Sequence, residues 1–511
     1  MDLNEKLLES NNNKVSDSFI LKLYHYYIHK GYFNLISTQI VSILTTIFLF
    51  LFIIFLFNCV DYHGLFILEE KDNASNYINW DDFFNYDILG WICFILFGVF
   101  IICKIVSLIE DIKIYYPIKL FYNDKLFIND SQIISSKWIS ILEKTKEIKD
   151  DKTLDIYTVT SKIMAKDNYL ISLIDKDKIK LYYMTKLMEW NIKYCIIHHI
   201  FNDKNKLKND LFDDREVYIK EIRTKLKIVS IVNFIFMPVI FIFVAFHNFF
   251  KYGEFFYTKP ELVTSRQWTL LSNWKYRNYN ELYHLFKERM DKSIQPTSEY
   301  INQFPSKVLE TFAKLVVFVL SSLFLLMLVL TLINENLLIN LHITNNRPIL
   351  WYIGILGTII AISKSAINDK LNFYPKEKFT KLREIMKYIP ESWVEQSDKL
   401  YIKNKILNLF KYQIFMLLSD ILHTLTIPFS LWYISHDIDE IVDFIIDNTN
   451  YDSKLGYTCD LASFKHFERI NYHKCDTKTY ISFDDFNEHY PNWLENKVNS
   501  NSVSINVINV L

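Results

Sequence analysis

The chain has 511 residues, 50% hydrophobic and 16% aromatic, which is long enough for several domains or several membrane spans. Lys and Arg number 57 against 58 Asp and Glu, and this balance argues against the basic surface of a nucleic-acid-binding protein. Its 6 cysteines are scattered without any CxxC pair, which argues against a disulfide framework.

Four apolar stretches are long enough to cross a bilayer, which takes roughly 20 apolar residues. They cover 36–58, 88–109, 313–333 and, more marginally, 349–366, and none contains a proline. The first 35 residues are polar, so we expect no removable signal peptide. The stretch 36–58 should then act as an uncleaved anchor.

Two further apolar stretches are interrupted. Residues 228–249 carry Pro238 in the middle, and 406–435 carry Pro428 together with Asp420 and His423. A proline inside a helix removes a hydrogen bond and kinks the helix, although spanning helices tolerate it. A kink combined with an ionisable residue favours a segment that enters the membrane and returns on the same side.

Loop charge orients these segments. The loop 59–87 is acidic and should be lumenal, whereas 1–35 and 251–312 carry many lysines and should be cytosolic. The prediction is four spanning helices, two re-entrant helices and two cytosolic termini. Six full spans is the alternative, and it would move 251–312 into the lumen.

The predicted fold is an all-α integral membrane protein with helical cytosolic regions. Within 277–292, Tyr279, Leu282, Tyr283, Phe286 and Met290 fall on one helical face. The full division is: cytosolic 1–35; first transmembrane hairpin 36–110 with lumenal loop 59–87; cytosolic 111–227; re-entrant 228–249; cytosolic 250–312; second transmembrane hairpin 313–366 with lumenal loop 334–348; cytosolic 367–405; re-entrant 406–435; cytosolic 436–511.

No catalytic motif is present in the sequence. It contains no GxxxxGK[ST], GxSxG or HExxH, so we expect neither an enzyme nor ATP-driven pumping, and no cofactor. Cys459, His466, His473 and Cys475 match no common zinc spacing, so no metal site is predicted.

Ionisable groups in or beside the apolar runs are the candidate functional residues. Such groups are costly in hydrocarbon and usually face a bundle interior or a wet cavity. A phospholipid headgroup crossing a bilayer needs such a polar path, but no catalytic group. The candidates are Lys104, Glu110, Lys364, Asp420 and His423, with Asn233 and Lys259 around the first re-entrant segment. Glu110 and Lys364 lie near helix ends, where reaching out to the interface explains them equally well.

Seven short motifs, in order along the chain, resemble one family. They are CVDY at 59–62, KIMAKDNYL at 162–170, WKYRNYNEL at 274–282, YINQFP at 300–305, RPILWYIG at 347–354, GYTCDLASF at 456–464 and PNW at 491–493. Together they resemble the autophagy-related protein 9 family over nearly the whole chain.

The resemblance implies a lipid scramblase of autophagy vesicles that needs no energy source. It also implies a domain-swapped homotrimer with four spanning and two re-entrant segments per subunit. Such proteins reside on small Golgi- and endosome-derived vesicles and at the preautophagosomal structure. Their implied partners are membrane phospholipids, the autophagy lipid-transfer protein and other autophagy factors. The alternatives are a vesicle scaffold that moves no lipid, and a channel or transporter.

Two N-x-[ST] sequons test this topology. Asn73 lies in the predicted lumenal loop and is the expected position of any glycan. Asn129 lies on the predicted cytosolic side and should stay unmodified.

Overall fold

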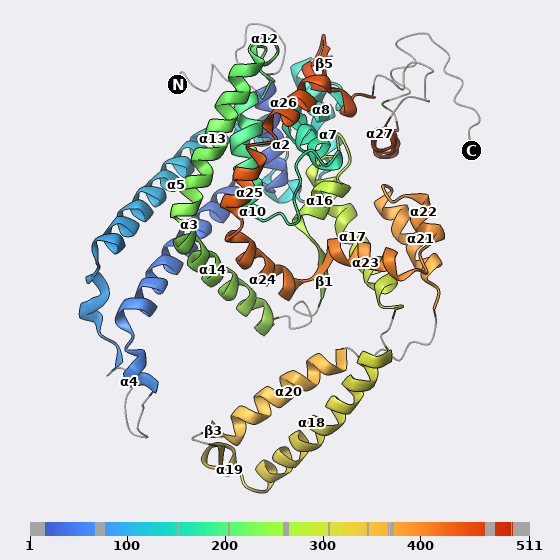
Figure 1. Cartoon of the computed structure of the whole chain (residues 1–511). Helices are drawn as coiled ribbons and strands as arrows, with labels where there is room; N and C mark the ends of the chain where they lie inside the picture. Colours follow the sequence, from blue (N-terminus) through green and yellow to red (C-terminus); the bar gives the residue numbers. More distant parts are fainter. Residues whose placement is uncertain are drawn as a thin grey trace. The chain divides into compact units, whose positions relative to one another are not determined.

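The computed structural model describes residues 16–66, 77–150, 154–202, 205–258, 265–304, 307–344, 347–365, 367, 373–464, 476–491 and 493. The chain is mostly helical and divides into two compact units (Figure 1). Unit 1 comprises Met1–Lys251, Asn273–Lys287 and Ser419–Leu511, and unit 2 comprises Tyr252–Ser272 and Glu288–Leu418. The predicted tail 496–511 and the candidates Asn73 and Lys259 lie outside the described residues.

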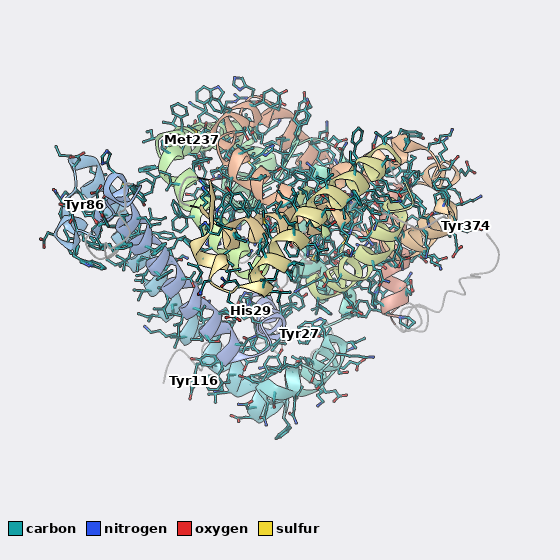
Figure 2. All side chains as sticks on the ribbon, turned by 90° about the horizontal axis from the view of Figure 1, so that it is seen from below. Tyr27, His29, Tyr86, Tyr116, Met237 and Tyr374 are labelled. Atoms are coloured by element: carbon teal, nitrogen blue, oxygen red, sulfur yellow. The ribbon has the colours of Figure 1, made fainter. Side chains whose placement is uncertain are left out.

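Unit 1 begins with a long apolar hairpin. Helix α3 (Tyr32–Ile54), continued by the π-helical turn η1 (Phe55–Cys59), runs beside α5 (Ile88–Leu120) (Figure 1). The rings of Phe50 and Phe97 stack across the pair with centroids 3.7 Å apart. Figure 2 shows side chains projecting all around this hairpin, between Tyr86 near one end and Tyr116 near the other. Both helices are long and apolar enough to cross a membrane.

The entry into α3 depends on one glycine and one carboxylate. Helix α2 (Asp17–Ile28) ends just before Gly31, whose φ of 109° is one that L side chains rarely adopt. Asp130 accepts hydrogen bonds from the backbone N–H of Tyr32 at 3.1 Å and from the Tyr26 hydroxyl at 2.5 Å. The carboxylate therefore caps the first apolar helix from a distant part of the chain.

Two pairs of helices are sharply bent. Helix α13 (Arg215–Ile235) meets α14 (Met237–Thr258) at 69°, and α24 (Gln413–Thr424) meets α25 (Ile427–Ile434) at 66°. Pro238 and Pro428 stand at the second positions of α14 and α25, where a missing N–H costs no helical bond. Figure 2 labels Met237 at the first bend. The prolines thus stand at the two breaks, which suit either a broken span or a re-entrant loop.

Unit 2 carries a second apolar hairpin. Helices α18 (Lys307–Ile333) and α20 (Ile349–Ser365) lie side by side, and the ring of Phe324 approaches the Cβ position of Gly357 to 3.6 Å (Figure 1). Helix α20 has 17 residues, which is at the lower limit for a span. The connection contains α19 (Leu337–Asn340), β2 (His342–Thr344) and β3 (Arg347–Pro348).

The rest of unit 2 is a small helical bundle. Strands β1 (Arg266–Trp268) and β4 (Phe410–Tyr412) pair antiparallel, with Trp268 opposite Phe410. The Trp268 indole donates to the Ser293 hydroxyl at 2.8 Å. The accompanying helices are α17 (Tyr283–Ile301), which begins in unit 1, α21 (Pro375–Met386), α22 (Glu391–Glu395) and α23 (Leu400–Leu409).

Unit 1 also contains a separate aromatic core and a further set of short elements. Tyr157, Phe464, Phe486, Tyr490 and Trp493 are buried against one another. The elements are α4 (Tyr62–Phe66), η3 (Trp80–Phe84), η4 (Phe121–Lys125), α6 (Asp130–Ile133), α7 (Trp138–Lys149), α8 (Ile156–Ile163), α9 (Ala165–Asp175), α10 (Lys186–Ile192), η5 (Lys193–Ile197), α11 (His198–Ile200), α12 (Asp210–Asp213), α16 (Leu270–Tyr276), which begins in unit 2, α26 (Ile438–Asp447), β5 (Thr449–Asp452), β6 (Gly456–Cys459), η6 (Asp460–Ala462) and α27 (Thr477–His489).

Two details of the sequence prediction are wrong. The described residues include three short two-stranded antiparallel sheets, so the chain is not purely α. The helix predicted over 277–292 begins only at Tyr283, and Tyr283 itself is exposed. The buried Tyr279 and Leu282 precede the helix, in a turn that places Asn280 at a φ of 54°. Side-chain hydrogen bonds to this turn override the helical periodicity.

Candidate functional site

Asp420 and His423 of the second bent pair contact Tyr183, which lies in a loop between α9 and α10. Tyr183 is buried and donates from its hydroxyl to Asp420 Oδ1 at 2.9 Å. Its ring lies 4.5 Å from that of His423, centroid to centroid. His423 Nδ1 lies 2.8 Å from the carbonyl oxygen of Ser419, one turn earlier in α24. The ring of His423 is thereby held against Tyr183, one turn beyond Asp420.

Basic side chains from several elements interact electrostatically with this carboxylate. Lys186 at the start of α10, Lys251 in α14 and His423 all interact electrostatically with Asp420. His247 in α14 in turn interacts with Lys251, Lys186 and Lys104. Lys104 lies within α5, with its Nζ 5.1 Å from the centroid of the Phe100 ring. We call Lys104, Tyr183, Lys186, His247, Lys251, Asp420 and His423 the polar cluster.

The polar cluster unites three of the candidates predicted from sequence. Asp420 and His423 come from α24, and Lys104 comes from α5. The three lysines of the cluster outnumber its one carboxylate, and this excess of positive charge suits a phosphate ester. Sequence reasoning missed Tyr183, Lys186, His247 and Lys251, since no local pattern ties them to residues far along the chain.

Three other candidates have different surroundings. Asn233 donates to the carbonyl of Val229 at 2.8 Å, so that its amide is bonded within its own helix. Glu110 is exposed on α5. Lys364 is exposed near the end of α20 in unit 2. For Glu110 and Lys364, the exposure fits a side chain that extends to an interface.

Three of the sequence motifs meet in the core of unit 1. Asn168 of the 162–170 motif and Asn280 of the 274–282 motif are joined by two hydrogen bonds of 2.9 and 3.0 Å. The Asn280 amide also donates to the carbonyl of Ala462, in the 456–464 motif, at 2.7 Å. Arg277 donates to Asp167 at 3.0 Å. These motif residues therefore hold three distant segments of unit 1 together.

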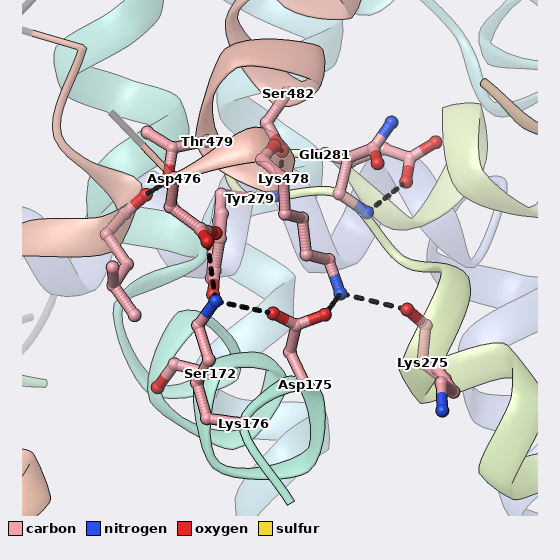
Figure 3. Close-up of polar contacts among 12 residues, drawn as sticks. Ser172, Asp175, Lys176, Lys275, Tyr279, Glu281, Asp476, Lys478, Thr479 and Ser482 are labelled. Carbon is pink, nitrogen blue, oxygen red and sulfur yellow. Dashed lines mark hydrogen bonds and ion pairs between the residues drawn. The ribbon is translucent and has the colours of Figure 1, made fainter. Parts of the chain in front are cut away.

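The same region holds the C-terminal helix. Lys478 of α27 is fully buried, 3.1 Å from Asp175 Oδ1, and it donates to the carbonyl of Lys275 at 2.9 Å (Figure 3). Lys176 forms a second, more exposed ion pair with Asp476 at 2.6 Å. These contacts tie α27 to α9 and to the 274–282 motif.

No metal site is apparent in the described part of the chain. No group of three or more His, Cys, Asp or Glu side chains there could hold an ion. Cys459 is buried at the end of β6, whereas His466, His473 and Cys475 lie outside the described residues.

The second sequon asparagine, Asn129, is the N-cap residue of α6 and forms a capping box with Gln132.

Comparisons with known proteins agree along the chain. A family model described as "Autophagy protein ATG9" matches residues 9–465. Autophagy-related protein 9 of Eremothecium gossypii is 30% identical over 495 residues, covering 91% of this chain and 55% of that protein. Autophagy-related protein 9 of Dictyostelium discoideum is 28% identical over 475 residues, covering 89% of this chain and 67% of that protein.

A solved structure gives the same result. The cryo-EM structure of Schizosaccharomyces pombe Atg9 has a TM-score of 0.67 and 26% sequence identity, covering 88% of this chain and 98% of that one. The chain spans about half the length of the first curated relatives it matches. By its sequence over most of its length and by its fold, the chain belongs to the autophagy protein ATG9 family.

Proposed function

We propose that the protein moves phospholipids between the two leaflets of autophagy membranes without an energy source, during the formation and expansion of the autophagosome. The polar cluster is the observation that carries this proposal. It sets lysines and one carboxylate within or beside the apolar helices α5, α14 and α24. Membership of the autophagy family supplies the cellular setting.

The physical argument concerns the headgroup. A zwitterionic or anionic headgroup loses its hydration when it enters hydrocarbon, whereas its acyl chains do not. Side chains that bind phosphate and hold water lower this barrier for the headgroup alone. Such a path runs in both directions and needs no hydrolysis, so we propose that the protein is not an enzyme and that added ATP leaves the rate unchanged.

The test is lipid exchange by the purified chain in liposomes. The wild-type protein should expose fluorescent phospholipid of the inner leaflet to an impermeant quencher without ATP. Lys104→Leu combined with Lys364→Leu should slow this exchange. Lys104→Leu removes a charge from an apolar helix, where it costs about 3 kcal/mol, and Lys364 is exposed, so the fold should stay intact. The two single variants separate the polar cluster from the second hairpin.

The matched control makes the same Lys→Leu substitutions at two positions away from the apolar helices. Lys144→Leu with Lys146→Leu alters two exposed lysines of α7 and should leave the rate unchanged. A normal rate in the Lys104/Lys364 variant would remove these residues from the path. No exchange by wild-type protein, in liposomes proven to contain it, would favour a vesicle scaffold.

Assembly and location form a second part of the proposal. We propose a domain-swapped homotrimer of Golgi- and endosome-derived vesicles and of the preautophagosomal structure, with both termini in the cytosol. Its proposed partners are the autophagy lipid-transfer protein and other autophagy factors. Light scattering of the purified chain in detergent should give the mass of three copies, and a monomer would contradict the trimer.

A further inference from the structure

Helix α13 changes character along its length, and its neighbours change with it. Near its start, Arg215 forms a two-bond ion pair with Asp443 of α26, at 2.5 and 2.9 Å. Two turns later, Arg223 pairs with Asp439. This end of α13 therefore requires water or protein around it, because ion pairs of exposed side chains belong in a polar medium.

The other end of α13 is apolar. Ile228, Ile231 and Phe234 are each at least half exposed in the chain. Phe234 meets Phe429 of α25 with ring centroids 6.0 Å apart. Apolar side chains so exposed on a helix of this kind are expected to face lipid. The boundary between the two media therefore crosses α13 between Arg223 and Ile228.

Two lysines and four exposed aromatic rings lie at this boundary. Lys227 Nζ is 5.5 Å from the ring centroid of Trp432, beside Tyr433 on α25. Lys225 Nζ is 3.9 Å from the ring centroid of Tyr194, which stacks on Trp190 at 5.2 Å with the rings parallel to within 1°. The four rings are 41–58% exposed. We call these six residues the aromatic–lysine collar.

The collar extends around the helix. Residues two apart on an α-helix differ by about 200° around the axis and only about 3 Å along it. Lys225 and Lys227 therefore leave α13 on nearly opposite sides at nearly the same height, and each has an aromatic ring beside its ammonium group. Trp and Tyr concentrate at this depth in membrane proteins, because one end of each ring system is apolar and the other is polar.

Both lysines retain donors for an anion. Among the described residues, neither ammonium has a carboxylate within 4 Å. Two nearby acidic side chains have other partners. Glu189 of α10 pairs with Lys193 at 2.8 Å, and Glu221 of α13 pairs with His199 at 3.0 Å. Lys225 gives one of its three N–H groups to the carbonyl of Tyr194, at 2.9 Å. An aromatic ring attracts a cation without neutralising it.

We propose that the aromatic–lysine collar binds the phosphate-bearing headgroups of anionic phospholipids, in the leaflet next to the polar helices of unit 1. The rings set the depth, and the two ammonium groups select negative over zwitterionic headgroups. This goes beyond lipid transfer, since the chain must lie in a bilayer but need not move lipid. Loss of both lysines should lower the preference for anionic lipid by about an order of magnitude.

The test measures which lipids surround one position. A fluorophore on a cysteine in place of Ile228, in a background without native cysteines, is placed in phosphatidylcholine nanodiscs. Headgroup-spin-labelled phosphatidylserine should quench it more strongly than spin-labelled phosphatidylcholine at equal density. Lys225→Gln with Lys227→Gln should bring the ratio of the two quenching constants close to one. Raising the ionic strength should do the same to the wild-type protein.

Control variants distinguish the effect of the lysine charges from misfolding and from a contact with a second copy of the chain. Lys144→Gln with Lys146→Gln on α7 and Lys225→Arg with Lys227→Arg should both keep the preference. If the Gln variant does not fold, the Arg variant and the salt dependence decide. A preference that survives both Gln substitutions and high salt overturns the proposal. So does a change of oligomeric state in the Gln variant at an unchanged quenching ratio, which would identify the collar as a contact with a second copy.

Discussion

Cys195 and Cys459 of unit 1 are buried, and burial makes their thiols harder to ionise. Burial raises the pKa of the Cys195 thiol to about 11 and that of Cys459 to about 12. Desolvation disfavours the thiolate, which is the reactive form. By contrast, Cys103 is exposed on the apolar helix α5.

We therefore predict that Cys195 and Cys459 resist alkylation in the native protein between pH 7 and 9, and react after denaturation. Because both pKa values are raised, the thiolate fraction in the folded state stays low until the pH approaches 11. Mass spectrometry of maleimide-treated protein, native and denatured, measures this. Rapid native modification of either thiol at pH 8 would show that the core around it opens.

At the scale of the elements, a buried ion pair between Lys478 and Asp175 joins α27 to α9. Lys478 has Asp175 and the carbonyl of Lys275 as its partners, along with the ring of Tyr279 at 5.7 Å. Asp175 has a second cation, because Lys176 lies 3.4 Å away (Figure 3). Removal of one partner of a buried pair leaves a charge without compensation, which costs about 3–5 kcal/mol.

The asymmetry predicts an order among variants. Asp175→Asn should destabilise the protein more than Lys478→Met, because Asp175 keeps Lys176 as a second cation when Lys478 is replaced. Lys381→Met, which breaks the exposed pair with Glu377, should cost under about 1 kcal/mol. Thermal unfolding in detergent measures all three. Equal losses for the two buried positions would mean that Lys176 gives Asp175 no support.

At the scale of the whole molecule, the sequence predicts what depends on local composition. Long apolar runs marked helices α3, α5, α18 and α20, because a span requires uninterrupted apolar length. Pro238 and Pro428 marked both bends, because proline cannot donate a helical hydrogen bond. Apolar length does not give helix ends: α5 continues to Leu120, beyond the apolar stretch 88–109.

Contacts between distant residues could not be predicted in this way. Tyr183 and Asp420 are 237 residues apart, and Asp175 and Lys478 are 303 apart. Nothing in the sequence around Tyr183 or Lys478 indicates that the side chain is buried or which residue it contacts. Of the candidate lipid-path residues, Asp420, His423 and Lys104 could be named because a charge in an apolar run is unusual, but their neighbours could not.

The membrane topology is the last prediction, and one pair of positions decides it. With four spans and two re-entrant segments, 251–312 faces the cytosol and 334–348 the lumen. With six spans, both assignments are reversed. Lys292 on α17 is 66% exposed at its side chain, and Glu335 lies exposed after α18, so a cysteine at either position is accessible to a reagent.

We predict that Lys292→Cys reacts with an impermeant maleimide in sealed vesicles with the cytosolic face outward, and that Glu335→Cys reacts only after the vesicles are opened. Lys146→Cys in α7 serves as the reference, since 111–227 is cytosolic in both topologies. Because the two positions exchange sides together, leakage of the reagent cannot imitate the reversed result. Labelling of Glu335→Cys but not Lys292→Cys in sealed vesicles would establish that the first bent pair, α13 and α14, crosses the bilayer.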